Sequence, residues 1–88
     1  MSEAFLGGRV KIRQPQTGFR AGLDAVMLAA AIPGIGARAL ELGSGAGTAS
    51  LCLAARLPEL AITGVELDAG LAALATENAA ENGMAKVR

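Results

Sequence analysis

The sequence predicts an α/β fold in which parallel strands alternate with helices, around a sheet that is incomplete within 88 residues. Two observations lead to this prediction. From residue 38 onward, short apolar segments of strand length alternate with longer segments of helical spacing, which is the order of a parallel sheet with right-handed crossovers. In addition, three glycines stand between the first of these strands and the helix after it, where α/β proteins place nucleotide-binding turns.

Composition narrows the class of protein. Hydrophobic residues make up 52% of the chain, which excludes a disordered protein. Lys and Arg together balance Asp and Glu at eight each, so net charge indicates neither nucleic acid nor a membrane surface. The longest apolar run, over residues 25–32, is far shorter than the roughly 20 residues of a membrane span. We therefore expect a soluble, cytoplasmic protein with no membrane partner.

The only cysteine is Cys52, and histidine is absent. No set of side chains has the type and spacing of a metal site, so we expect no metal. Because Cys52 lies in an apolar stretch, we expect a buried, inert thiol, which suits a reducing compartment.

The first 37 residues form an N-terminal segment. Residues 1–8 show no clear element. Val10–Arg13 alternates apolar and basic residues, the period of a half-buried strand, and Pro15 ends it. Lys11 and Arg13 would share a solvated face, the alternative being a contact with a phosphate backbone. A glycine-punctuated turn follows, and then a helix from Leu23 or Asp24 to Ala31, with Asp24 as N-cap or first-turn acid.

Residues 38–88 form the first strand–helix–strand–helix part of a cofactor-binding domain. The strand over 38–42 has little alternation, as expected when helices cover both faces of a sheet. On the last helix, Leu71, Leu74, Ala75 and Asn78 share one face. The predicted elements are strands over 38–42 and 60–66, helices over 48–57 and 68–82, a helix stop at Gly83, and the start of a further strand over 84–88.

The glycine loop has the spacing G-x-G-x-G, at Gly43, Gly45 and Gly47. Dinucleotide-binding proteins use G-x-G-x-x-G or G-x-G-x-x-A, and Thr48 occupies the last required position. A phosphate-binding P-loop is also excluded, because no Gly-Lys-Ser or Gly-Lys-Thr follows.

Acidic residues flank this loop. Glu66 ends the next strand, about 20 residues beyond the glycines, where an acid accepts hydrogen bonds from both hydroxyls of a ribose. Glu41 precedes the first glycine and binds either the amino group of a cofactor or the loop amides. Asp68 is interpreted as a helix cap.

These residues resemble a known family. The stretch over 39–47 is similar to the first motif of class I S-adenosylmethionine-dependent methyltransferases, and Val65-Glu66-Leu67-Asp68 to their acidic motif. The stretches over 7–10, 14–20, 23–30 and 78–83 resemble the tRNA1(Val) adenine-37 N6-methyltransferase family. The resemblance implies a Rossmann-like fold, S-adenosylmethionine as cofactor, tRNA or another structured RNA as substrate, and a role in tRNA processing.

The resemblance also implies roles for single residues. The loop backbone would lie against the cofactor, Glu66 would hold the ribose, and Leu67 would line the adenine pocket. Gly18, Arg20 and Asp24 fall in the segment that covers the methionine end of the cofactor. The residues expected to bind the cofactor are Gly18, Arg20, Asp24, Glu41, Gly43, Ser44, Gly45, Gly47, Glu66 and Leu67.

The catalytic motif of such enzymes, Asn-Pro-Pro-Tyr or a close variant, is absent from the sequence. No catalytic residue is therefore expected here, and the chain is expected to be an N-terminal fragment, inactive alone. Alternatives are a non-catalytic binding or assembly fragment, a methyltransferase acting on ribosomal RNA or a protein glutamine, and a dinucleotide oxidoreductase, which Thr48 disfavours. An exposed sheet edge would leave the chain partly folded or would make it a homo-oligomer.

Overall fold

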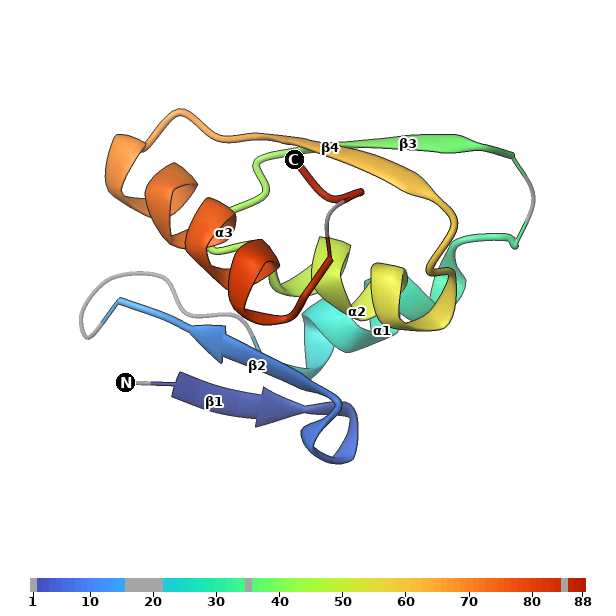
Figure 1. Ribbon diagram of the computed structural model, residues 1–88, viewed down its shortest axis with the longest axis horizontal. Coiled ribbons are helices and arrows are strands. Elements are labelled where there is room, and N and C mark those ends of the chain that lie inside the picture. Colours follow the sequence, from blue (N-terminus) through green and yellow to red (C-terminus); the bar gives the residue numbers. More distant parts are fainter. Residues whose placement is uncertain (1, 16–21, 35, 85) are drawn as a thin grey trace.

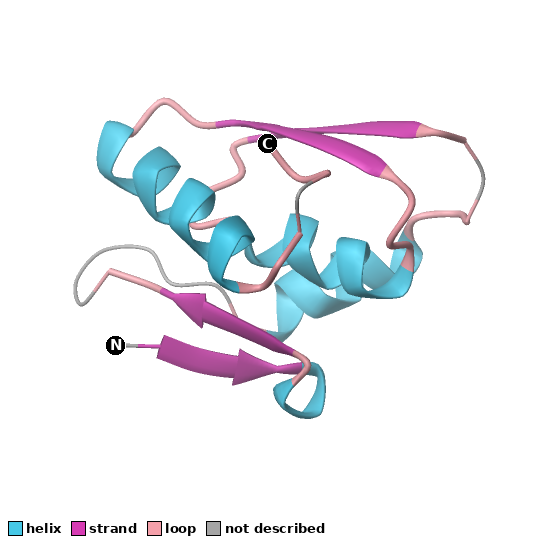
Figure 2. Ribbon diagram, in the orientation of Figure 1, coloured by secondary structure: helices cyan, strands magenta, loops and turns pink. Residues whose placement is uncertain are grey.

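The computed structural model describes residues 2–15, 22–34, 36–84 and 86–88, and it arranges them in three layers (Figure 1). A parallel sheet forms one layer, three helices lie beneath it, and an antiparallel hairpin lies beyond the helices (Figure 2). In chain order the elements are β1 (Ser2–Phe5), a 3-10 turn η1 (Leu6–Gly8), β2 (Val10–Arg13), α1 (Leu23–Ala31), β3 (Arg38–Leu42), α2 (Thr48–Arg56), β4 (Ala61–Val65) and α3 (Ala69–Glu81). The predicted α/β class is confirmed, and the predicted elements from residue 10 onward lie within a few residues of their expected bounds.

Strands β3 and β4 form the parallel sheet, in a register that runs from Arg38 opposite Ala61 to Leu42 opposite Val65. The other edge of β4 pairs with the end of the chain, where Ile62 is bridged to Val87 in parallel. The amide of Arg88 donates to the carbonyl of Ile62 at 2.8 Å. Val87 therefore forms an isolated bridge within residues 84–88, where the sequence predicts the start of a further strand.

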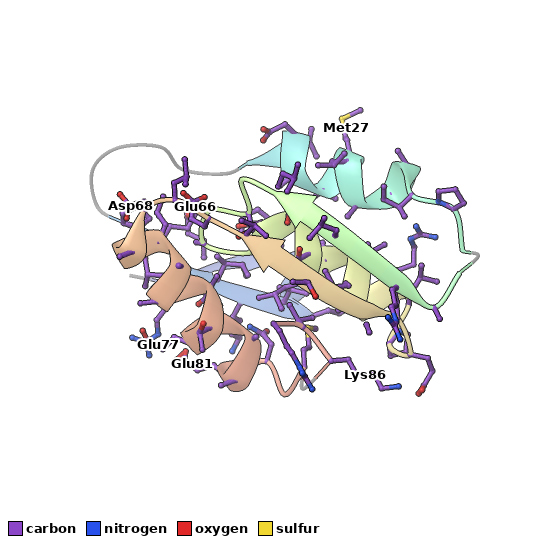
Figure 3. All side chains as sticks on the ribbon, turned by 90° about the horizontal axis from the view of Figure 1, so that it is seen from above. Met27, Glu66, Asp68, Glu77, Glu81 and Lys86 are labelled. Carbon is purple, nitrogen blue, oxygen red and sulfur yellow. The ribbon has the colours of Figure 1, made fainter. Side chains whose placement is uncertain are left out.

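Helices cover only one face of this sheet within the described residues, which corrects the expectation of two covered faces. Ile62 is buried on the inner face, whereas Leu40, Leu42 and Val65 on the outer face are 64%, 75% and 46% exposed. Figure 3 looks down on this outer face, and no described helix lies over it. Among the described residues no strand pairs with the free edge of β3, and the expected self-association through it stays a prediction.

The hairpin of β1 and β2 shows that residues 1–8 contain an element, contrary to expectation. Phe5 pairs with Val10 and Ser2 with Arg13. The turn between the strands has positive φ at Leu6, Gly7 and Gly8, and the two glycines adopt this conformation without steric cost. Sequence missed β1 because its four residues show no alternation, and its partner defines it.

Strand β2 alternates as predicted. Val10 and Ile12 are fully buried and belong to a hydrophobic cluster with Leu51. Lys11 and Arg13 are exposed, and Arg13 forms an ion pair with Glu81 of α3 at 2.8 Å.

Helices α2 and α3 also begin and end where local signals place them. Cys52 of α2 is buried, as predicted. Asp68 is the N-cap of α3, since its side chain accepts from the amide of Leu71 at 2.9 Å, and Gly83 follows the helix with a φ of 67°. In the part of the chain described, no helix combines the length and apolarity needed to span a membrane.

Candidate functional site

The glycine loop leaves the carboxyl end of β3 and is held against β4. The amides of Gly43 and Ser44 both donate to the carbonyl of Val65, at 2.7 and 3.1 Å. Gly43, Gly45 and Gly47 have φ values of 72°, 57° and 93°, in the left-handed region that other residues adopt at a cost. The three glycines are therefore required by the path of the backbone.

Their surroundings separate these glycines into two kinds. A Cβ at Gly47, the N-cap of α2, would lie 3.4 Å from the Cβ of Ala75, so this glycine lets α2 start close to α3. A Cβ at Gly43 or Gly45 would meet no described atom within 4 Å. The backbone at these two positions is thus open to a ligand.

A cavity of about 310 Å³ lies beside this open part of the loop. Its walls come from Gln14 after β2, one side of α1, the end of β3 with its loop, the first turn of α2, and Glu66 and Leu71. The expected cofactor residues Asp24, Glu41, Gly43, Ser44, Gly45 and Glu66 all line it. The fold therefore brings together residues that are up to 42 positions apart, from Asp24 to Glu66.

Glu66 is fixed at the end of β4 by two backbone amides. One carboxylate oxygen accepts from Gly45 at 2.7 Å and the other from Asp68 at 3.0 Å. Figure 3 shows Glu66 and Asp68 together where β4 leads into α3. The amides of Asp68 and Gly45 lower the pKa of Glu66, so its carboxylate is ionised at neutral pH and clamps the glycine loop.

Glu41 lies deeper in the cavity wall and has the opposite pKa shift. Burial raises the pKa of its carboxyl group, against the opposing effect of Ser50. The hydroxyl of Ser50 donates to Glu41 at 2.6 Å. Ser50 of α2 therefore orients Glu41, while no bond from a described loop amide to Glu41 is seen.

Asp24 lies at the rim of the cavity, in the first turn of α1. Its carboxylate accepts from the amide of Gly22 at 3.1 Å, and Gly22 is the N-cap of the helix. Asp24 is thus a first-turn acid, one of the two positions expected for it.

Two other predicted residues, Leu67 and Gly47, are not among the described lining of this cavity. Leu67 is fully exposed and is not part of the lining, so its role against an adenine ring stays a prediction. Gly47 lines a neighbouring cavity that also includes Ser44 and Glu66. Gly18 and Arg20 lie outside the described residues.

Two polar residues of the lining, Gln14 and Thr48, are not among the single residues expected to bind the cofactor. Gln14 does begin the stretch over 14–24, which resembles the segment that covers the methionine end of the cofactor. Gln14 is buried and donates to Glu3 at 2.7 Å; its place just before Pro15, at the end of a strand, was the available signal. The hydroxyl of Thr48 is buried, and no described protein group bonds to it. In the sequence, Thr48 serves only to exclude the dinucleotide-binding pattern, which requires Gly or Ala at that position. A hydroxyl at the start of a helix can also bind a ligand.

The described residues of the lining carry charge of one sign. Asp24, Glu41 and Glu66 are acids, and no described lining residue is basic. The described residues contain no group of three or more His, Cys, Asp or Glu side chains placed to hold a metal ion. The three carboxylates of this lining favour a ligand that carries positive charge.

No protein-family model matches the chain, and no curated protein matches it at a significant level. Several solved structures, in contrast, match the chain. A putative O-methyltransferase from Klebsiella pneumoniae matches with a TM-score of 0.66 and 27% identity, over 85% of this chain and 35% of that one. The YcgJ protein of Bacillus subtilis matches with a TM-score of 0.61 and 26% identity, over 76% of this chain and 29% of that one.

The chain has a partial, methyltransferase-type Rossmann-like fold. It spans about a third of the length of these two structural relatives. In this fold the glycine loop and Glu66 stand at the carboxyl ends of neighbouring parallel strands, the edge where open α/β sheets bind ligands.

Proposed function

We propose that the cavity beside the glycine loop binds S-adenosylmethionine, and that the chain is the cofactor-binding part of a methyltransferase. The observation that carries this proposal is the composition of the cavity wall. Open backbone at Gly43 and Gly45 adjoins three carboxylates, with no base among the described lining residues.

The chemistry of the cofactor fits this wall. S-adenosylmethionine carries a sulfonium and an ammonium group, and carboxylates attract both cations. Its ribose presents two hydroxyl donors. Each carboxylate oxygen of Glu66 already accepts one amide, and each retains a second lone pair for a hydroxyl.

The start of α2 supplies the complementary group. The first amides of a helix lack partners inside the helix and favour an anion, so this end suits the carboxylate of the methionine part. The buried hydroxyl of Thr48, which no described protein group satisfies, is a further donor at the same place. A dinucleotide fits less well, because Thr48 stands where the dinucleotide-binding loop pattern requires Gly or Ala.

When bound, the cofactor supplies an electrophilic methyl group on sulfur. The residues of this chain bind and orient it: Glu66 holds the ribose, the loop backbone lies against it, and Glu41 and Asp24 face its positive end. Fixed orientation of the reacting groups accounts for much of the rate of such transfers.

We further propose an adenine of tRNA as the methyl acceptor of the whole enzyme, on the resemblance over residues 7–10, 14–20, 23–30 and 78–83 alone. Such a base is taken out of its stack before it reacts. Because the chain contains no Asn-Pro-Pro-Tyr motif, we expect the chain by itself to bind cofactor and to transfer no methyl group.

Isothermal calorimetry with S-adenosylmethionine, S-adenosylhomocysteine and NAD tests the binding proposal. We expect binding of the first two, and tighter binding of S-adenosylmethionine because only its sulfur is charged. NAD that bound more tightly than both, or binding of none of the three, would contradict the proposal. Methyl transfer from labelled cofactor to tRNA by the chain alone would show that its inactivity was wrongly inferred.

A further inference from the structure

Asn78 of α3 is a polar side chain that is completely buried. Its amide oxygen accepts from the backbone amide of Arg13 at 2.8 Å. Its amide nitrogen donates to the carbonyl of Arg13 at 3.0 Å and to the carbonyl of Ala46 at 2.8 Å. A buried amide group with this number of partners is held in one orientation.

These three bonds join two walls of the cavity. Arg13 ends β2 and is followed by Gln14, which lines the cavity from the side of the hairpin. Ala46 lies in the glycine loop and lines the cavity from the side of that loop. Asn78 itself is not part of the lining, so its effect on a ligand passes through these two segments.

We propose that Asn78 is a positioning residue, which sets the spacing between the Gln14 wall and the glycine loop and thereby the ligand-binding geometry of the cavity. The ligand in this inference is the one given under the proposed function. The link between Asn78 and the loop does not depend on what the ligand is.

Asn82, the C-cap residue of α3, provides a control with the same type of bonds, although its side chain is only partly buried. Its side chain makes the same pair of bonds with Lys11, accepting from the amide at 3.0 Å and donating to the carbonyl at 2.7 Å. Its third bond goes to the carbonyl of Asn78 at 2.8 Å. Asn82 thus attaches the hairpin to α3 just as Asn78 does, but it makes no bond to the glycine loop.

The experiment compares Asn78→Asp with Asn82→Asp. In each variant an oxygen replaces the amide nitrogen and faces two backbone carbonyls, so both lose stability. Two quantities are measured: the NMR chemical shifts of the Gly45 and Gly47 amides without ligand, and the dissociation constant of S-adenosylhomocysteine. For N78D we expect displaced loop signals and about tenfold weaker binding, the effect of one or two buried hydrogen bonds. For N82D we expect loop signals and affinity close to those of the native chain.

Equal effects of the two variants on the loop signals would overturn the proposal, as would N78D signals and affinity that match the native chain. If N78D does not fold, Asn78→Ala and Asn82→Ala take the place of the two variants, since alanine removes all the side-chain bonds at each position without adding a charge. Native chain that binds no S-adenosylhomocysteine would refute the proposed function, and the loop signals would still decide the role of Asn78. If the native chain binds S-adenosylhomocysteine, and N78D and N82D do not differ in their affinity for it or in their loop signals, only the role of Asn78 is refuted.

Discussion

Gly64 of β4 lies directly against Ser44 of the glycine loop. A Cβ at Gly64 would stand 2.9 Å from the Cβ of Ser44, closer than two carbon atoms approach without one moving. The same residue of the loop is hydrogen-bonded to Val65, the next residue of β4. Glycine at position 64 therefore lets the loop fold back over the end of the parallel sheet.

We predict that Gly64→Ala destabilises the chain by about 1–3 kcal/mol, the usual cost of an added methyl group in a packed site. The clash also moves the loop, so the affinity for S-adenosylhomocysteine falls beyond what partial unfolding explains. Denaturant unfolding and calorimetry measure the two effects. Gly70→Ala is the control, because its Cβ would meet only the Asp68 side chain, at 3.2 Å. A G64A variant that binds and unfolds like the native chain would show that Ser44 moves away from the added methyl group at no cost in stability or affinity.

Gly45 and Gly83 form a second matched pair, since both have positive φ and open space where a side-chain methyl group would lie. Replacing either by Ala costs about 1–2 kcal/mol of backbone strain. We predict that only Gly45→Ala weakens cofactor binding, because its methyl group enters the space beside the cavity. Thermal unfolding checks that the two losses of stability are similar. Affinity lost equally in both variants would place the ligand elsewhere.

The cap of α3 is predicted to matter for stability alone. Asp68→Ala removes the bond from the Leu71 amide to the carboxylate and costs about 1 kcal/mol. Asp68→Asn keeps the cap and restores most of that loss. Because the bond from Asp68 to Glu66 uses the backbone amide, both variants should bind S-adenosylhomocysteine with native affinity. A large loss of affinity in D68N would instead make the Asp68 carboxylate a ligand group.

Local signals made much of this fold predictable. Three features depend only on residues close to them in the sequence, and the structure has each of them where the sequence predicts it: the helix cap at Asp68, the helix end at Gly83 and the glycine loop. Three features depend on distant partners and were not predicted. Strand β1 is defined by its pairing with β2, and one face of the parallel sheet stays uncovered by the described helices.

Asn78 is the third such feature. The sequence places it on the apolar face of α3, and Asn78 is indeed buried, but the reason for an amide there is invisible locally. Its partners Arg13 and Ala46 lie 65 and 32 positions away. For the same reason only part of the cavity was predictable. The glycine loop and the acidic residues have local signals in the sequence, whereas the position of Gln14 depends on how the hairpin packs.

Glu66 should act through its charge. In Glu66→Gln one of the two backbone amides faces an NH₂ group, and the acceptor for one ribose hydroxyl is lost, so we predict about tenfold weaker binding of S-adenosylhomocysteine. Glu59→Gln is the control: the pKa of Glu59 is also lowered, by Lys86, and Glu59 lies outside the cavity lining. Calorimetry that found equal affinity for E66Q and E59Q would exclude the ribose role.

The lowered pKa of Glu66 gives a pH dependence with a definite sign. The acid stays ionised as pH falls from 7 toward its ordinary range of about 4.3, so its contribution to affinity is constant there. Its contribution to stability is likewise present above the unfolded-state pKa and is lost only as pH falls through the lower folded-state pKa. A loss of affinity between pH 7 and 6 would point to another group.

Glu41 should show the opposite behaviour. Because burial raises its folded-state pKa, the folded chain binds its proton more tightly than the unfolded chain does. Stability from this group is therefore present below the unfolded-state pKa and is lost as pH rises through the folded-state pKa. Glu41→Gln keeps an oxygen to accept from Ser50 and removes the charge, so at pH 7 it should stabilise the ligand-free chain. The gain should shrink toward pH 4, and denaturant unfolding at the two pH values measures it.

The same Glu41→Gln variant also tests which part of the cofactor Glu41 faces. If Glu41 faces the sulfonium, the variant binds S-adenosylmethionine more weakly, while its affinity for S-adenosylhomocysteine, which lacks the sulfonium, changes less. Equal weakening of both ligands would assign Glu41 to the ammonium group that they share.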